Sequence, residues 1–361
     1  MESTKSIGIK DIARLAGVST GTVDRVLHKR GKVSPEASQK VLSTLERINY
    51  RPNFLARNLG SNKIQRIAVL IPDSKTDEYW YQCKQGINQA AANWEHFNIA
   101  LELFFFDLND KDSFQKAAKQ VIDDQPHGVL IAPLFYVEAL PYFKLLEENQ
   151  IHYVLFNTDI KDARPLSFIG QNSFHSGRVA AELLHMHISG IENESAVFAI
   201  VHIEEDLPNS VHLLEKEKGF REYFKEATNI NAEINLVTHT LGNPADIDFK
   251  SQLNTLFTIS DLKGIFVSTS KAFEVASFMD TYKKKRVRIV GYDLLSKNLF
   301  YLKRGMIDFL IHQNPKRQAF QGISTLANYL IFNKEVKTRN LFPLEVITRE
   351  NLSSHLNADT F

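Results

Sequence analysis

Thr20, Thr22 and Arg25 are the side chains near the start of the chain best suited to hydrogen bonding with nucleic acid. They lie on one side of a predicted helix whose other side is apolar. An Arg can donate to guanine O6 and N7 or to a phosphate, and a hydroxyl can donate to either kind of acceptor. We therefore expect this polar face to meet the edges of bases in a DNA major groove.

Two short helices and a turn must position these side chains. Apolar residues recur at helical spacing within residues 9–28 and predict one helix before the break at Gly17 and one after it. The glycine suits the turn, and Ser19 can cap the second helix. A third helix is predicted to start after a Ser34 cap and to end before Pro52. Helices joined by such a turn are the sequence form of a helix-turn-helix.

The run DIARLAGVSTGTVDRVL, continued by VSPEASQKVLSTLERINYRPNFLARNL, resembles the DNA-binding headpiece of the lactose-repressor (LacI/GalR) family in order and spacing. The resemblance implies base-reading positions at Thr20, Gly21 and Arg25. It implies phosphate contacts from a further set of hydroxyl and basic side chains: Ser19, Thr22, His28 and Lys32. For Arg25 and His28 the alternative is an ordinary solvated side chain.

Asp24 departs from the family pattern, in which a Ser is common at this position. A carboxylate facing the DNA backbone would be repelled by the phosphates. We therefore expect Asp24 to pair with His28 or Lys29 as local structure, one turn further along the helix.

The segment FLARNL, about two turns long, is too short to be a stable helix alone. The resemblance implies that Leu59 wedges into the minor groove at the centre of the operator, where unstacking is offset by the contacts of a bent duplex. Asn53, Ala56 and Arg57 belong to the same implied hinge, in which Asn53 and Arg57 would serve the groove or the phosphates. The alternative is that Leu59 packs against the headpiece or the sensor.

Charge is distributed unevenly along the chain. The first 60 residues hold 11 Lys and Arg against 5 Asp and Glu, a net charge of +6, whereas the remainder sums to −5. This is expected of a DNA-binding module joined to a sensor. Cys83 is the only cysteine, no apolar signal segment opens the chain, and no run of about 18 apolar residues occurs. We expect a cytoplasmic protein without a membrane span.

After a polar linker, apolar runs alternate with helical stretches, which predicts the buried parallel strands of an α/β fold. Strands are predicted at 67–71, 101–106, 128–134, 152–157, 196–203, 234–238, 264–268 and 287–292, and helices at 81–97, 112–125, 137–149, 175–189, 216–227, 245–257 and 271–282. About 300 residues exceed what one doubly wound sheet usually holds, so two lobes are expected. The expected fold is a small all-α headpiece followed by a two-lobed α/β region with doubly wound parallel sheets.

The order of these elements resembles the periplasmic-binding-protein-like sensor that follows the headpiece in the same family. Local matches are FIGQNSFHSGRVAAELL, EKGFREYF, VRIVGYD, IHQNPKRQAFQG and FPLEVITREN. The resemblance implies two lobes joined by three crossovers. The expected boundaries are 1–52 for the headpiece, 53–63 for the hinge and linker, and 64–361 for the effector-binding and dimerisation domain, with an N-lobe at about 64–168 and 312–333 and a C-lobe at about 169–311 and 334–361.

Ligands of doubly wound sheets bind beyond the carboxyl ends of the strands, so polar residues that follow strands are candidates for an effector site. Asp73, Asn157, Asp159 and Asp293 occupy such positions. The resemblance places Asp293 where relatives hold a sugar hydroxyl, and a carboxylate can accept two hydroxyl hydrogen bonds. The alternative for Asp293 is a hinge or capping carboxylate.

Aromatic residues follow two of the predicted strands. Tyr79, Trp80 and Tyr81 come after the first strand, and Phe135 and Tyr136 after the third. They can stack on the apolar face of a sugar or anchor a helix to the core, and the sequence leaves both interpretations open.

The family pattern is broken at two places in the expected effector site. Lys216 stands where many relatives place an Arg, and it cannot make the same bidentate fork. Thr269 and Ser270 stand where an Asn-Asp pair is common. The remaining candidates are Asn172, His175 and Gln313. A hexose or pentose is the expected effector, with a phosphorylated sugar, a nucleoside or another small polar metabolite left open.

These features predict a ligand-responsive transcriptional regulator, a repressor that binds a pseudo-palindromic operator in double-stranded DNA as a homodimer. The effector is expected to change the angle between the lobes and thereby to order or melt the hinge. One alternative is a solute-binding protein of a transport system, which the basic headpiece disfavours. Another is a dinucleotide-using enzyme, which the missing GxGxxG disfavours. No catalytic residue or cofactor is predicted, because GxxxxGK(S/T), HExxH and GxSxG are missing as well. No metal site is predicted, because the two histidines of HMH at 185–187 face different directions on a helix.

Overall fold

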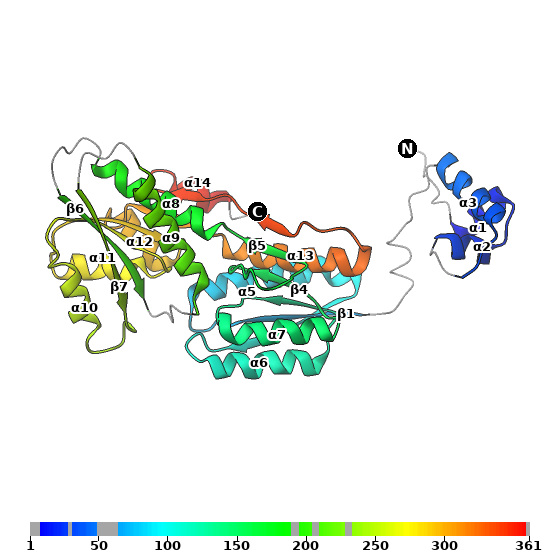
Figure 1. The fold of residues 1–361 in the computed structure, drawn as a ribbon, viewed down its shortest axis with the longest axis horizontal. Helices are drawn as coiled ribbons and strands as arrows, with labels where there is room; N and C mark the ends of the chain where they lie inside the picture. The colour runs from blue at the N-terminus through cyan, green and yellow to red at the C-terminus, as the bar shows by residue number, and fades with distance from the viewer. Residues whose placement is uncertain are drawn as a thin grey trace. The chain divides into compact units, whose positions relative to one another are not determined.

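The computed structural model describes residues 8–27, 31–48, 64–188, 195–203, 209–227 and 233–358. The chain separates into two compact units, residues 1–63 and residues 64–361 (Figure 1). Among the described residues, no helix combines the length and the apolar composition needed to cross a membrane.

Three helices form the described part of the first unit. They are α1 (Ile9–Ala16), α2 (Thr20–Leu27) and α3 (Pro35–Arg47). Their buried side chains meet in one small core made of Ile12, Ala13, Ala16, Val23 and Val41. Gly17 ends α1 in the left-handed region at φ +66°, where glycine has no steric penalty. The Ser34 hydroxyl accepts from the backbone N–H of Ala37 at 3.3 Å, as expected of a cap for α3.

The second unit contains two six-stranded sheets. The first has the strand order β11-β5-β4-β3-β1-β2, with all neighbours parallel. Its strands are β1 (Gln65–Pro72), β2 (Ile99–Phe106), β3 (Gly128–Ile131), β4 (His152–Phe156), β5 (Ser167–Gly170) and β11 (Arg339–Leu341). Its helices are α5 (Glu78–Trp94), α6 (Lys111–Asp124), α7 (Tyr136–Glu148) and α13 (Pro315–Phe332), with the short helix η1 (Glu95–Phe97) after α5.

Both faces of this first sheet are covered by helices. Along β1, Ile67, Val69 and Ile71 pack with α5 and α13, whereas Ala68 and Leu70 pack with α6 and α7 (Figure 1). Successive strand side chains point to opposite faces, so a strand buried on both sides must be apolar throughout. This is why β1 was readable as a continuous apolar run.

The second sheet repeats the design with the order β12-β10-β9-β8-β6-β7, in which only β12 runs antiparallel to its neighbour. Its strands are β6 (Ser195–Ile203), β7 (Glu233–Leu241), β8 (Leu262–Val267), β9 (Arg288–Tyr292), β10 (Phe309–His312) and β12 (Glu345–Ile347). Its helices are α8 (Ser173–Ile188), α9 (Val211–Glu226), α10 (Phe249–Leu256), α11 (Ala272–Thr281), α12 (Ser296–Lys303) and α14 (Leu352–Ala358). We call the first sheet with its helices the N-lobe and the second the C-lobe.

The chain passes between the lobes three times, after β5, after β10 and after β11. The fold class and the three crossovers are as expected, but the lobe boundaries need correction. The range 334–361 was assigned wholly to the C-lobe, yet β11 pairs with β5 in the N-lobe. The edge of β5 would otherwise leave backbone groups unpaired, and it accepts this partner through hydrogen bonds such as Phe342 N to Gly170 O at 2.7 Å.

Each strand run predicted from the sequence is a strand, but two helices begin four or more residues away from the predicted start. The helix predicted at 216–227 starts at Val211, and the one predicted at 245–257 starts at Phe249. The second shift has a local cause, because Asn243 Oδ1 accepts from the N–H of Ala245 at 2.8 Å and holds this segment in a turn.

Candidate functional site

The exposed side of α2 presents the polar residues expected to read DNA. Ser19, Thr20, Gly21 and Arg25 are exposed, and Thr22 is half-buried. The Ser19 hydroxyl accepts from the N–H of Thr22 at 3.1 Å, which makes Ser19 the cap of α2.

The absence of a side chain at Gly21 leaves room beside Arg25. A Cβ added at Gly21 would lie 3.7 Å from a terminal nitrogen of Arg25, so the guanidinium lies next to bare backbone on this face. Lys32 is also exposed. Other residues predicted to contact DNA lie outside the described residues: His28, Asn53, Ala56, Arg57 and Leu59. His28 and Lys29, the two partners expected for Asp24, also lie outside the described residues.

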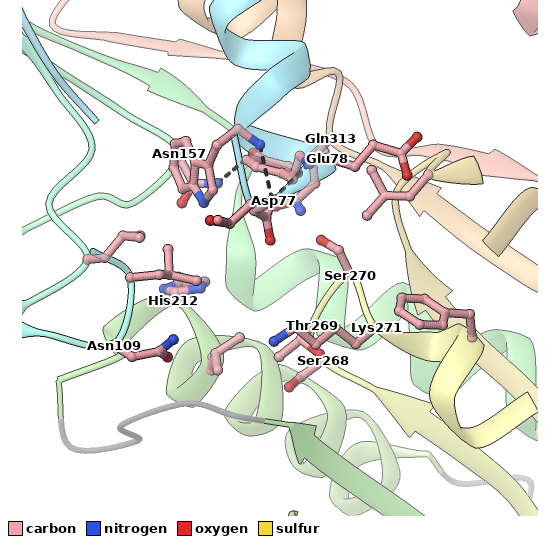
Figure 2. Close-up of a pocket in the computed structure, with 18 of the residues that line it drawn as sticks. Asp77, Glu78, Asn109, Asn157, His212, Ser268, Thr269, Ser270, Lys271 and Gln313 are labelled. Carbon is pink, nitrogen blue, oxygen red and sulfur yellow. Dashed lines mark hydrogen bonds between the residues drawn. The ribbon is translucent and has the colours of Figure 1, made fainter. Parts of the chain in front are cut away.

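A cavity of about 460 Å³ lies between the two lobes at the carboxyl ends of the strands (Figure 2). Its N-lobe wall is made of residues 76–80, 107–109, 134 and 157, and its C-lobe wall of residues 212, 213, 216, 268–271, 273, 295, 297 and 313. Parallel doubly wound sheets place ligands at this edge. A second cavity of about 820 Å³ shares Leu108, Asn109 and Leu134 with the first, so the cleft continues past it.

The start of α5 forms much of the N-lobe wall. Asp77 caps this helix, and its carboxylate accepts from the N–H groups of Tyr79 at 2.8 Å and Trp80 at 3.1 Å. Burial raises the pKa of Asp77 above its ordinary range. A dinucleotide-binding sheet offers its first helix N-terminus to a pyrophosphate, whereas here a carboxylate already occupies that position. This arrangement disfavours the dinucleotide-enzyme alternative.

Asn157 joins the end of β4 to this wall. Its Nδ2 donates to the hydroxyl of Tyr79 at 2.7 Å, and Trp80 packs edge-on against Tyr79 with the ring centroids 5.0 Å apart. Tyr79 and Trp80 are almost fully buried in the N-lobe core, although both touch the cavity. They therefore anchor α5, and only part of each ring is available to a ligand.

Asp293 does not line the cavity, contrary to the expectation that it holds a ligand hydroxyl. It is fully buried at the end of β9, with φ +65°. Its carboxylate accepts from Ser270 Oγ at 2.6 Å, from Gln313 Nε2 at 2.7 Å and from the N–H of Gln313 at 3.1 Å. The carboxylate thus fixes two cavity-lining residues, Ser270 and Gln313, and Gln313 lies in the second crossover. This role resembles the alternative interpretation of Asp293 as a hinge carboxylate.

Lys216 is buried in the C-lobe wall. Its Nζ lies 3.6 Å from the ring centroid of Tyr292 and donates to the carbonyl oxygen of Ser268 at 3.0 Å. A cation over an aromatic face is stabilised by the ring quadrupole, and this offsets part of the cost of burying the ammonium. Thr269 follows Ser268, is 7% exposed and lines the cavity, and its hydroxyl oxygen has no hydrogen-bond partner among the described residues.

The twelve predicted effector residues divide into two groups. Six line the cavity: Tyr79, Trp80, Asn157, Lys216, Thr269 and Gln313. Beside Asp293, five others do not line it: Asp73, Tyr136, Asp159, Asn172 and His175.

Each of those five residues is engaged elsewhere. Asp73 Oδ1 accepts from the N–H of Lys75, and the Tyr136 hydroxyl donates to Asp162 at 2.7 Å. Asp159 forms an ion pair with Arg339 at 2.7 Å, and Asn172 Oδ1 accepts from the N–H of His175 at the start of α8. Position after a strand was therefore an incomplete guide, because turns and helix starts occupy the same edge.

Sequence reasoning missed several cavity residues, notably Asp77, Asn109, His212, Lys271 and Lys297. Two of them carried a readable signal. Asp77 precedes the apolar start of α5 as a helix cap, and His212 lies one helical turn before Lys216. Within the described residues, no group of three or more His, Cys, Asp or Glu is arranged to hold a metal ion.

His212 makes the stability of the protein depend on pH. Burial, followed by the charge of Lys216, lowers the pKa of His212 to about 3. An unfolded His titrates near 6.5, so as the pH falls the unfolded state binds the proton first. The free energy of unfolding should therefore decrease between about pH 6.5 and pH 3. We expect His212→Asn to flatten this part of the profile in urea unfolding, and a variant profile parallel to wild type would refute the assignment.

Comparison with known proteins divides the chain where the structure does. The family model described as "Periplasmic binding protein domain" matches residues 67–335, and the one described as "Bacterial regulatory proteins, lacI family" matches residues 8–53. Catabolite control protein A of Staphylococcus epidermidis is 29% identical over 157 residues, 44% of this chain and 46% of the relative. The transcriptional regulator MalR of Streptococcus pneumoniae is 27% identical over 164 residues, 44% and 48% of the two chains. The chain thus spans about half the length of these relatives.

Solved structures cover more of the chain. A protein from Bacteroides fragilis assigned as a LacI transcriptional regulator is 32% identical, covering 81% of this chain and 99% of its own, with a TM-score of 0.74. A glucose-galactose binding protein from Geobacillus stearothermophilus is 19% identical, covering 80% and 99%, with a TM-score of 0.69. A solute-binding protein from Burkholderia graminis in complex with D-arabinose is 19% identical, covering 81% and 98%, with a TM-score of 0.69. The latter two share the fold alone.

Proposed function

The chain belongs to the lacI family of bacterial regulatory proteins, and on that premise we propose that it is a DNA-binding transcriptional repressor controlled by a sugar-type effector. The observation that carries this proposal is the presence, in one chain, of an exposed polar α2 face and a ligand-sized cavity between two lobes. The solute-binding alternative explains the cavity but gives the helix-turn-helix no role. We further propose that the protein acts in the cytoplasm.

The proposed operator is a pseudo-palindrome bound by a homodimer, because two headpieces must meet two half-sites. The test is to incubate the full chain with fragmented genomic DNA of its source at near-physiological salt and to sequence the retained fragments. We expect one enriched pseudo-palindrome upstream of a few operons, with two chains bound per site in sedimentation. If DNA is retained without any enriched sequence, both in the absence of sugar and in the presence of D-arabinose, D-glucose, D-galactose, maltose or lactose, the protein is not a sequence-specific regulator.

Arg25 is proposed to read a base from the exposed face of α2. Replacing it with Ala should weaken binding to the recovered operator by about 10- to 100-fold, because one good bidentate contact contributes about 1–3 kcal/mol of discrimination. The measurement is a titration by fluorescence anisotropy at fixed salt. Arg14→Ala removes the same charge from an exposed position on α1 and should change the affinity by less than about threefold. Equal losses in both variants would mean that Arg25 contributes only charge.

The proposed effector is a neutral sugar held by hydrogen bonds from both lobes. Amide, hydroxyl and ammonium groups of Asn109, Asn157, Thr269, Lys216 and Gln313 line the cavity together with the edge of an aromatic ring, a combination that suits polyols. Calorimetric titration of D-arabinose, D-glucose and D-galactose tests this, and maltose and lactose belong in the panel because the cleft continues into a second cavity. We expect one of these sugars to bind and to shift operator affinity. No binding by any of them would redirect the search to the other polar metabolites.

A further inference from the structure

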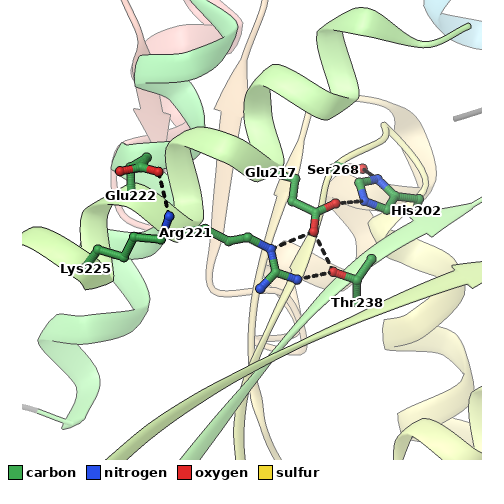
Figure 3. A network of polar contacts seen from close by, with 7 residues as sticks. All are labelled: His202, Glu217, Arg221, Glu222, Lys225, Thr238 and Ser268. Atoms are coloured by element: carbon green, nitrogen blue, oxygen red, sulfur yellow. Dashed lines mark hydrogen bonds and ion pairs between the residues drawn. The ribbon is translucent and has the colours of Figure 1, made fainter. Parts of the chain in front are cut away.

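A chain of hydrogen bonds leads from the surface of the C-lobe to the wall of the cavity (Figure 3). It starts at Glu217 on α9, whose Oε1 accepts from Arg221 Nε at 2.8 Å and from Thr238 Oγ1 at 2.6 Å. The other carboxylate oxygen lies 2.8 Å from Nε2 of His202, near the end of β6. The second ring nitrogen of His202, Nδ1, lies 2.7 Å from the hydroxyl oxygen of Ser268.

The two neighbours of His202 impose a direction on this chain. The hydrogen bond from His202, with those from Thr238 and Arg221, lowers the pKa of Glu217 to about 2, so the carboxylate is ionised and can only accept. A neutral His202 must then carry its proton on Nε2. Its Nδ1 is left as an acceptor. The Ser268 hydroxyl has two acceptors within reach, this Nδ1 at 2.7 Å and the carbonyl oxygen of Val201 at 3.3 Å, and it donates to the nearer one.

Ser268 links this network to the cavity through its backbone. Its carbonyl oxygen accepts from the Lys216 ammonium at 3.0 Å, and Thr269 follows it directly. The Thr269 hydroxyl is nine-tenths buried, lines the cavity and has no partner in the described part of the chain. Buried hydroxyls are rarely left unpaired, so this one fits a hydrogen bond from or to a bound ligand.

We infer that His202 and Glu217 are positioning residues for effector recognition, which hold Ser268 so that Lys216 and Thr269 meet one hydroxyl-bearing part of a neutral sugar. The inference rests on the proposed function of the cavity. His202 itself is fully buried and does not line the cavity, so it acts through Ser268. The ionisable groups next to the ring lie on α9: Glu217, which contacts it, Arg221, which pairs with that carboxylate, and His212, which is neutral.

Two substitutions at His202 separate the two hydrogen bonds. An Asn side chain places a polar atom where Nδ1 lies, so His202→Asn keeps the contact with Ser268 and loses the one with Glu217. A Gln side chain places its polar atom where Nε2 lies, so His202→Gln keeps Glu217 and loses Ser268. Loss of the hydrogen bond to the ionised carboxylate should cost more stability, because charge-assisted hydrogen bonds are the stronger ones.

The experiment measures both variants of the full chain by thermal unfolding and by calorimetry with the sugar of the panel that binds wild type. We expect His202→Asn to bind that sugar within about threefold of wild type and His202→Gln to bind it about tenfold more weakly, as expected for one lost hydrogen bond. The unfolding temperatures should rank the variants in the opposite order. A merely structural role would give the same ranking in both measurements, and that result would overturn the inference.

A second measurement does not require a ligand. Long-range ¹H–¹⁵N correlation spectra of wild type, with the His202 signals identified by their loss in both variants, report which ring nitrogen carries the proton. In spectra recorded at a pH at which the ring is neutral, we expect the proton on Nε2. A neutral ring protonated on Nδ1 would overturn the inference. If no sugar binds wild type, the proposed sugar effector fails, and the tautomer still decides the direction of the network.

Discussion

Replacing Asp293 with Ala should lower the unfolding temperature by about 6 °C or more and abolish measurable sugar binding. The substitution removes the acceptor of three hydrogen bonds and leaves buried donors of Ser270 and Gln313 unpaired. Each unpaired buried donor costs about 1–3 kcal/mol, and in a domain of this size 1 kcal/mol corresponds to about 2–4 °C. The measurements are circular dichroism during heating and calorimetry with the sugar panel.

Asp107→Ala is the matched control, because Asp107 also follows a strand and lines the cavity but is exposed. Within the part of the chain that the structure describes, its carboxylate accepts one hydrogen bond, from the N–H of Asn109 at 2.8 Å. We expect a change of unfolding temperature below about 2 °C, in line with a solvated turn residue. The change in unfolding temperature for Asp293→Asn should lie between those of the two Ala variants, because Asn tolerates φ +65° and keeps one acceptor oxygen. If Asp293→Ala unfolds like its control, the carboxylate does not hold the crossover.

Asp293 illustrates which features of the site can be predicted from the sequence and which cannot. Its position after a strand was predictable from the apolar run VRIVGY, and with it the edge of the sheet where the cavity lies. Whether the carboxylate would face a ligand or a crossover depends on Gln313, which arrives from a different part of the chain. A hydrogen bond between residues that are distant in sequence has no signature in periodicity or spacing.

The elements missed by sequence reasoning have a common physical cause. The strand β11 has only three residues, too few for an alternating pattern to be recognised, and its register with β5 is fixed by backbone hydrogen bonds. His202 lies inside the apolar run AVFAIVHI and its partner Glu217 lies on another element, so neither residue alone signals a buried pair. The headpiece was easier to predict, because its caps and turn depend on residues that are close together in the sequence, and its core forms within about 35 residues.

Replacing Gly177 with Ala should destabilise the C-lobe by about 1–3 kcal/mol or more and weaken sugar binding at the same time. The helices α8 and α9 cross with their backbones in contact: a Cβ at Gly177 would lie 1.9 Å from the carbonyl oxygen of Lys216, and one at Gly219 would lie 1.8 Å from that of Phe174. These atoms are backbone and cannot rotate away. The helices must therefore separate, which moves Lys216 relative to Tyr292 and Ser268.

Gly21→Ala is the matched control for this prediction. Gly21 is also in a helix, but a Cβ there would meet its nearest neighbours at 3.7 and 3.9 Å, which is ordinary contact. Ala favours helix over Gly by about 0.5–1 kcal/mol, so the control should hold or raise the stability of its helix and leave sugar binding unchanged. Unfolding and calorimetry of both variants give the comparison. Should Gly177→Ala retain full stability and full sugar affinity, the close crossing would not be what positions Lys216, and the network through Ser268 would have to hold the ammonium alone.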